Sequence, residues 1–199
     1  VYASMAALAL SSGLKLNMIS AAESLKNYDV PPGRMRLLRG IESSLIIDDT
    51  YNSSPFACES ALQTLGETKC TGRKIAILGD MLELGKHTVE AHKNIGKIVK
   101  ENADILIIVG QRAKSIKEGA IEAGMNTENP PDGRAGIFEF LDSYEAGNFI
   151  KTFLKNGDIV LIKGSQVMRM ERTVEAILLD QANKNILLVR QDKEWLAKK

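Results

Sequence analysis

The sequence predicts an α/β fold: a Rossmann-like, mostly parallel sheet with helices on both faces. Short β-branched runs alternate with helix-length amphipathic segments from about residue 41 onward, a pattern typical of strands joined by crossover helices. Most of these runs are continuously apolar, as expected for strands that are covered on both faces. Polar or glycine-containing turns follow the runs, and such turns gather at one edge of a parallel sheet.

Two helical segments precede the alternating region. Residues 1–10 are rich in Ala and Leu, which favours helix, and residues 17–28 carry apolar side chains at helical spacing. A Pro-Pro-Gly turn at residues 31–33 interrupts the chain. We therefore expect residues 1–40 to be the trailing edge of one domain plus a connector, cut from a larger protein, and residues 41–199 to form a second domain.

The alternating region predicts five strands and five helices. The strands are expected at residues 44–48, 74–78, 105–109, 137–140 and 159–162. The helices are expected near residues 55–66, 88–102, 111–124, 142–155 and 166–180. A final apolar run at residues 186–189 is expected to add an edge strand.

The composition excludes several classes of function. The 26 basic and 25 acidic side chains leave a net charge of +1, so no overall field attracts nucleic acid. No apolar run approaches the roughly 20 residues that span a bilayer. Cys58 and Cys70 form no paired motif, which predicts free thiols in a reducing cytoplasm. His87 and His92 are spaced so that they lie on different faces of a helix, which argues against a zinc site.

The polar residues after the predicted strands supply the candidate site. Residues 48–55 follow the first strand, residues 79–80 the second, and residues 163–165 the fifth. Each turn taken alone has a structural explanation, such as the helix cap at Ser54. The adjacent Asp48 and Asp49 are harder to explain, because two carboxylates at a buried strand end lose hydration unless a partner binds them.

The usual nucleotide-binding fingerprints are absent from the sequence. There is no GxGxxG motif, and residues 79–87 differ from a P-loop by one extra residue between the glycines and by His87 in place of Ser or Thr. If the protein uses ATP with Mg²⁺, another domain must hold the phosphates and the metal.

Three segments in order resemble signatures of the Mur ligase family. Residues 48–55 read DDTYNSSP and resemble DDxYNANP, with Ser53-Ser54 in place of the usual Ala-Asn. Residues 75–85 read IAILGDMLELG and, with His92 and Gly96, resemble LGDMxELG…H…G. Residues 160–171 read VLIKGSQVMRME and resemble LVKGSRxxxME. Pro32-Gly33-Arg34 also resembles the linker that ends the family's central ATPase domain.

This resemblance implies the C-terminal domain of a three-domain, ATP-dependent amide ligase, preceded by a small helical remnant of the central ATPase domain. The motifs are most similar to those of members that add D-alanyl-D-alanine to UDP-N-acetylmuramoyl-tripeptide in peptidoglycan synthesis. In that reaction ATP phosphorylates the substrate carboxylate, and the amine of the dipeptide attacks the acyl phosphate. The implied partners are ATP, D-alanyl-D-alanine, UDP-N-acetylmuramoyl-tripeptide and the upstream domains of the same chain. The 199 residues alone are expected to be inactive.

The resemblance also implies site residues, none of them covalent catalysts or metal ligands. The residues implied for the nucleotide are Arg34 for its phosphates or ribose, Asp49 for the ribose hydroxyls, and Tyr51 and Asn52 for the adenine. The residues implied for the dipeptide are Lys163, Ser165 and Arg169, with Asp80 and Glu83 for its amine.

Two alternatives remain open at this point. One is a Mur-type ligase with another substrate, such as a diamino acid or a folate glutamate. The other is a small-ligand binding module that has this sheet and no chemistry. The pairing of Asp-Asp-x-Tyr-Asn with Lys-Gly-Ser favours the D-alanyl-D-alanine ligase.

Overall fold

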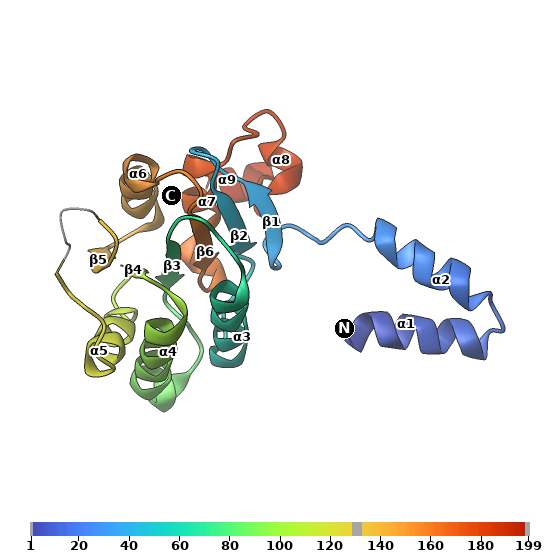
Figure 1. Cartoon of the computed structure of the whole chain (residues 1–199), viewed down its shortest axis with the longest axis horizontal. Helices are drawn as coiled ribbons and strands as arrows, with labels where there is room; N and C mark the ends of the chain where they lie inside the picture. Colours follow the sequence, from blue (N-terminus) through green and yellow to red (C-terminus); the bar gives the residue numbers. More distant parts are fainter. Residues whose placement is uncertain (1, 129–132, 198–199) are drawn as a thin grey trace. The chain divides into compact units, whose positions relative to one another are not determined.

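The computed structural model describes residues 2–128 and 133–197 (Figure 1). The chain divides into two compact units, Val1–Pro31 and Pro32–Lys199. The first unit contains helices α1 (Tyr2–Gly13) and α2 (Met18–Ser24), followed by a 3₁₀ turn. The side chain of Asn17 accepts hydrogen bonds from two amides of α2 and caps this helix, as expected of an N-cap asparagine.

The second unit begins earlier than the boundary expected at residue 40. Strand β1 (Arg36–Arg39) pairs antiparallel with β2 (Leu45–Asp49), so residues assigned to a connector belong to the sheet. The sequence did not indicate this strand because it is short, has charged ends and follows a Pro-Gly turn. The origin of the first unit in an ATPase domain stays a prediction.

The described residues of the second unit form a six-stranded sheet in the order β1-β2-β6-β3-β4-β5. All pairs other than β1–β2 are parallel, which confirms the predicted fold class. The remaining strands are β3 (Lys74–Gly79), β4 (Ile105–Val109), β5 (Gly136–Phe140) and β6 (Ile159–Lys163). Each of the five predicted strands is present, with ends within about a residue of those expected.

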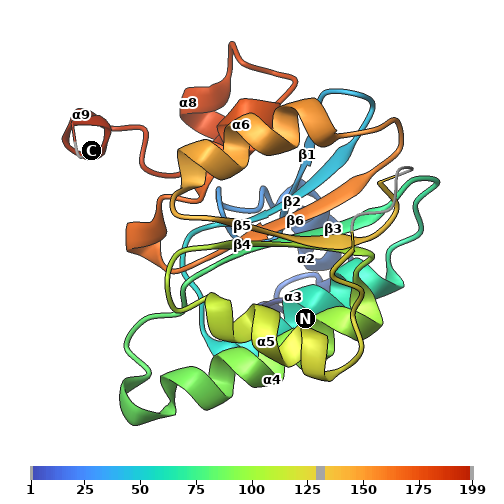
Figure 2. The ribbon, with the colours of Figure 1, turned by 90° about the vertical axis from the view of Figure 1, so that its left-hand side faces the viewer.

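Helices cover both faces of this sheet (Figure 2). Helices α3 (Pro55–Glu67), α4 (Thr88–Asn102) and α5 (Lys114–Glu122) lie on one face. Helices α6 (Ser143–Phe153) and α7 (Glu171–Ile177) lie on the other. Successive strand residues point to opposite faces and so form two apolar layers. Ile47, Ala76 and Leu161 belong to the layer under the first group of helices. Ile46, Ile75 and Val160 belong to the layer under the second group. Among the described residues no helix has the length and apolarity to cross a membrane.

The C-terminal region differs from its prediction in two respects. The expected edge strand at residues 186–189 is wrong: this stretch contains the end of a short helix, α8 (Lys184–Leu187). Strand β1 already occupies the edge beside β2, so an apolar run there packs against the second core layer instead of pairing. The helix expected at residues 166–180 is divided by Arg169, whose φ of +53° is incompatible with a continuous right-handed helix.

The glycine of the second motif, Gly96, serves the packing of α4 against α5. A Cβ at Gly96 would lie 2.0 Å from the carbonyl oxygen of Ile116, and a Cβ at Gly119 would lie 2.0 Å from that of Lys93. The two helices therefore touch backbone to backbone, which a larger residue at either position prevents.

Candidate functional site

A cleft lies where the carboxyl ends of β2 and β6 meet the start of α3. Its volume is about 430 Å³. The turn before β1, the loop after β2, the first turns of α3 and the end of β6 all contribute to its wall. Its lining includes Gly33, Arg34, Met35, Asp49, Tyr51, Asn52, Phe56, Ser60, Thr64 and Lys163. The four residues implied for the nucleotide therefore share one cleft, together with one residue implied for the dipeptide.

Asp49 and Lys163 form an ion pair in the wall of this cleft. The Nζ of Lys163 donates to Oδ2 of Asp49 at 2.5 Å and to the carbonyl oxygen of Asn52 at 2.9 Å. The other carboxylate oxygen of Asp49 accepts from the amide of Met35 at 3.1 Å. The Lys163 side chain is 2% exposed. An ammonium has three N–H donors, so one of them remains for a ligand in the cleft.

Asp48 points to the opposite face of the sheet and supports the loop from behind. Its carboxylate accepts from the Thr50 hydroxyl at 2.6 Å and from the amides of Thr50 and Gly33. Burial raises the pKa of Asp48 to about 6, although these hydrogen bonds act in the other direction. The adjacent acids thus divide between two faces, and each obtains protein partners that offset its lost hydration.

Tyr51 presents its ring at the mouth of the cleft. Its side chain is 45% exposed, and the guanidinium of Arg34 lies 4.0 Å from the ring centroid. The backbone is fixed, because the Tyr51 amide donates to the carbonyl oxygen of Gly33 at 2.9 Å. Gly33 has a φ of +69°, and a Cβ there would lie 2.9 Å from the Tyr51 nitrogen, so this turn requires glycine.

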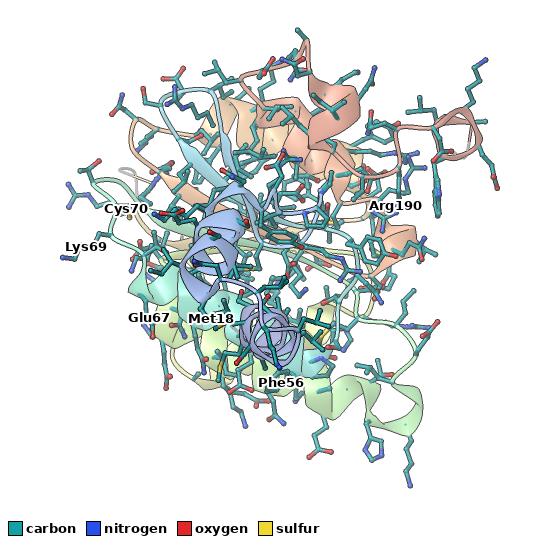
Figure 3. All side chains as sticks on the ribbon, turned by 90° about the vertical axis from the view of Figure 1, so that its right-hand side faces the viewer. Met18, Phe56, Glu67, Lys69, Cys70 and Arg190 are labelled. Carbon is teal, nitrogen blue, oxygen red and sulfur yellow. The ribbon has the colours of Figure 1, made fainter. Side chains whose placement is uncertain are left out.

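The start of α3 closes one side of the cleft. Ser54 caps the helix by accepting from the amide of Ala57, and Pro55 occupies the first turn, as the sequence predicted. Phe56 is 81% exposed and projects from the surface of α3 (Figure 3). Cys58 is buried behind Lys163, and burial raises the pKa of its thiol to about 12. Cys58 and Cys70 are both free, as predicted.

The other residues implied for the dipeptide are not in the lining of this cleft. The Ser165 amide donates to the carbonyl oxygen of Asp80, and the Ser165 hydroxyl accepts from the amide of Leu82 at 2.9 Å. The Asp80 carboxylate accepts from the amide of Ala113 at 2.8 Å. Asp80 and Ser165 are thus joined, while Glu83 is exposed at a turn with a φ of +63°.

His92 of the second motif holds this turn in place. It is buried; its Nε2 accepts from the amide of Met81 at 3.0 Å, and its Nδ1 lies 2.7 Å from the carbonyl oxygen of Thr88. The ring is therefore neutral and protonated on Nδ1. Burial lowers the pKa of His92, which favours the same form.

Arg169 belongs to a buried ionic cluster that sequence reasoning did not find. It is 6% exposed, and its Nε lies 2.5 Å from Glu171 Oε1. The second oxygen of Glu171 binds Arg190 at 3.0 Å, and the Nη1 of Arg169 donates to the carbonyl oxygen of Trp195. Glu171 belongs to the third motif, so the sequence did mark this residue. Arg190 and Trp195 lie in a tail without a recognised pattern.

A mostly parallel sheet between two helix layers, with a cleft at the carboxyl ends of neighbouring strands, is typical of open α/β domains, a class in which ligands generally bind at that edge. A family model described as "Mur ligase, glutamate ligase domain" matches residues 33–166. The chain belongs to this family.

Several curated proteins are similar over most of the chain. UDP-N-acetylmuramoyl-tripeptide–D-alanyl-D-alanine ligase of Bacillus subtilis strain 168 is 29% identical over 175 residues, which cover 87% of this chain and 36% of that protein. The protein of the same name in Escherichia coli K12 is 28% identical, covering 86% of this chain and 35% of the relative. The chain thus spans about a third of the length of these relatives.

Solved structures agree with this relationship. One structure of MurF from Acinetobacter baumannii gives a TM-score of 0.70 at 26% identity, covering 86% of this chain and 36% of that one. MurF ligase from Thermotoga maritima, solved in complex with ADP, gives a TM-score of 0.64 at 26% identity, covering 85% of this chain and 35% of that one.

Proposed function

We propose that this chain is the C-terminal part of an ATP-dependent ligase that adds D-alanyl-D-alanine to UDP-N-acetylmuramoyl-tripeptide in the cytoplasm. The observation that carries the proposal is the shared cleft, in which Arg34, Asp49, Tyr51 and Asn52 meet Lys163. The names of the curated relatives support the substrate, and the ADP complex of the Thermotoga maritima relative supports an adenine nucleotide as the ligand.

The cleft suits the adenosine part of the nucleotide. The exposed ring of Tyr51 offers a stacking surface, and the exposed amide of Asn52 offers donors and an acceptor to a base edge. Asp49 retains acceptor capacity for ribose hydroxyls, because a carboxylate has about four lone-pair sites and it uses one for Lys163 and one for Met35. Arg34 is exposed at the mouth and supplies positive charge for the phosphates.

The reaction itself depends on groups beyond this cleft. ATP supplies the phosphoryl group that activates the peptide carboxylate, and the amine of the dipeptide then displaces phosphate to form the amide. Mg²⁺ and most of the contacts to the phosphates are assigned to an upstream ATPase domain, because the 199 residues contain no P-loop. We assign Ser165, Asp80, Glu83 and Arg169 to the side of the cleft from which the dipeptide approaches, where they orient it without covalent chemistry.

The proposal is tested with the full-length protein that contains this chain. Purified protein is incubated with ATP, Mg²⁺ and UDP-N-acetylmuramoyl-tripeptide, and products are measured by mass spectrometry. We expect a product only when D-alanyl-D-alanine is added. Its mass should exceed that of UDP-N-acetylmuramoyl-tripeptide by the mass of the dipeptide minus one water. Turnover with a diamino acid, or with a folate and glutamate, would assign a different ligase, and no turnover with any amine would favour a binding module. Residues 1–199 alone should give no turnover.

A further inference from the structure

Arg190 contacts the loop after β2, residues 50–54, although it lies outside the part of the chain that the family model matches. It follows α8 in the C-terminal tail, beyond residues 33–166 of the family match. In Figure 3 it lies at the opposite end of the domain from Lys69 and Cys70, on the side where the parallel strands have their carboxyl ends. The position of Arg190 in the sequence therefore does not predict that it lies beside the loop after β2.

The guanidinium of Arg190 binds the backbone of the loop after β2. One terminal nitrogen donates to the carbonyl oxygen of Thr50 at 3.1 Å, and the other donates to that of Tyr51 at 2.5 Å. The residue is 9% exposed and has a φ of +58°, an uncommon conformation for a non-glycine residue. A buried arginine that donates to two successive carbonyl groups fixes the peptide planes between them, because its donors have a rigid, planar geometry.

Glu171 holds the guanidinium in this orientation. It is fully buried and accepts from Arg190 at 3.0 Å through one oxygen and from Arg169 through the other. The charge of Asp48 also favours the charged form of Arg190, in addition to that of Glu171. A buried arginine needs such partners, since an unpaired charge in the interior is strongly destabilising.

These contacts restrain Tyr51 from both sides. The Tyr51 amide donates to the carbonyl oxygen of Gly33, and its own carbonyl oxygen accepts from Arg190. The next residue, Asn52, is held by its carbonyl oxygen on Lys163. The backbone of the loop is therefore fixed at successive residues, and the side chains of Tyr51 and Asn52 remain exposed.

We propose that Arg190, held by Glu171, is a positioning residue that sets the orientation of Tyr51 and Asn52 toward the nucleotide. The C-terminal tail then contributes to nucleotide binding by ordering the loop that lines the cleft. This inference rests on the proposed function of the cleft as a nucleotide site, and the experiment below separates a failure of one from a failure of the other.

The test uses Arg190→Gln and Arg190→Lys in the full-length protein, with Lys193→Gln as the control. Lys193 is exposed in the same tail, so its replacement removes the same charge without touching the loop. Hydrogen exchange of the amides at residues 49–54 is measured by mass spectrometry, the dissociation constant for ADP by calorimetry, and kcat and KM for ATP by phosphate release. Thermal unfolding confirms that each variant is folded.

We expect Arg190→Gln to speed exchange at residues 49–54 and to raise the dissociation constant for ADP and the KM for ATP about tenfold, the effect of losing a charge-assisted hydrogen bond. The kcat at saturating ATP should change little. Arg190→Lys should be intermediate, because it keeps the charge beside Glu171 but not the planar fork. Lys193→Gln should match the unmodified protein.

Two results would overturn the inference in different ways. Unchanged exchange at residues 49–54 in folded Arg190→Gln would show that the tail does not order the loop. Faster exchange with an unchanged ADP dissociation constant would show that the loop does not bind the nucleotide, and the proposed function of the cleft would then fail as well. If Arg190→Gln does not fold, Arg190→Lys and Glu171→Gln give the same comparison.

Discussion

The ammonium of Lys163 and the carboxylate of Asp49 meet at 2.5 Å across the neighbouring strands β6 and β2. Their side chains are 2% and 13% exposed. This pair stands between the apolar core and the cleft, so it serves the stability of the domain and the shape of the site together. Replacing Asp49 therefore affects both properties, and its effect on ATP kinetics alone does not identify a direct contact with the nucleotide.

Lys163→Met should lower the free energy of unfolding by about 3–5 kcal/mol, because it leaves the Asp49 carboxylate nearly buried without a cation. Urea denaturation measures this change. The control is Lys114→Met, which removes a pair with Glu139 whose side chains are 47% and 32% exposed. That surface pair should contribute about 0–1 kcal/mol. Equal losses in the two variants would contradict the structural role of Lys163.

Asp48 should make stability depend on pH between about 4 and about 6. Burial raises its pKa from 3.8 to about 6, so the folded state holds this proton more tightly than the unfolded chain does. The contribution of Asp48 to the free energy of unfolding is thus largest below pH 3.8 and is lost as the pH rises through about 6. Asp48→Asn should remove this part of the slope in urea titrations, and the carboxyl carbon resonance of Asp48 should titrate near pH 6. A midpoint near 4 would contradict the prediction.

His92→Ala should destabilise the domain by about 1–3 kcal/mol, because the amide of Met81 then loses its buried acceptor. His87 is exposed in the turn before α4, and His87→Ala serves as the control with an expected change below about 0.5 kcal/mol. Nitrogen-15 spectra should show Nε2 of His92 unprotonated at pH 7. Because its folded pKa is lowered, the stabilisation from His92 should be lost as the pH falls through the ordinary range of histidine.

Gly96→Ala should cost about 1–3 kcal/mol or more, since the added methyl group would lie 2.0 Å from a carbonyl oxygen of α5. Neither backbone can move without separating α4 from α5. Lys97→Ala on the exposed side of α4 is the control and should be close to neutral. Thermal unfolding of the two variants compares them directly. A tolerated Gly96→Ala would mean that the helices are farther apart than described.

Tyr51→Leu should raise the dissociation constant for ADP about tenfold, the effect expected when a base loses an aromatic stacking partner. Tyr144 provides a matched control, because it is also exposed and also lies beside an arginine, Arg172, at 4.4 Å from the ring centroid. Tyr144→Leu should leave ADP binding unchanged. Calorimetry with the full-length protein measures both constants. An unchanged value for Tyr51→Leu would remove the ring from the nucleotide site.

Most of the sheet was predictable from the sequence because its strands are short, apolar and regularly separated by helices. Residues 105–109 and 159–162 needed no information beyond this pattern. Strand β1 escaped prediction because Arg36 and Arg39 mask a strand that pairs on one side only. The edge strand expected at residues 186–189 was wrong for a related reason. An apolar run alone does not indicate whether it pairs with the edge of a sheet or packs on its face.

The cleft was predictable as a set of residues and not as a network of contacts. The motifs indicated Asp49, Tyr51, Asn52 and Lys163, and the structure brings them into one cleft. Their mutual contacts depend on strands β2 and β6 being neighbours, which the chain order does not reveal. The contribution of Arg190 depends on where the tail returns to the sheet, and no local pattern specifies that path.

Asp49 and Lys163 are also register partners in the parallel pairing of β2 with β6. If either strand slipped by one residue, every side chain on it would change faces, and the lysine would enter an aliphatic layer that contains Ile46 and Ile162. Misaligned pairings of these two strands are therefore heavily penalised during folding, whereas Val, Ile and Leu alone would distinguish the alignments poorly. The same two charges that border the cleft thus select a single alignment of the sheet that builds it.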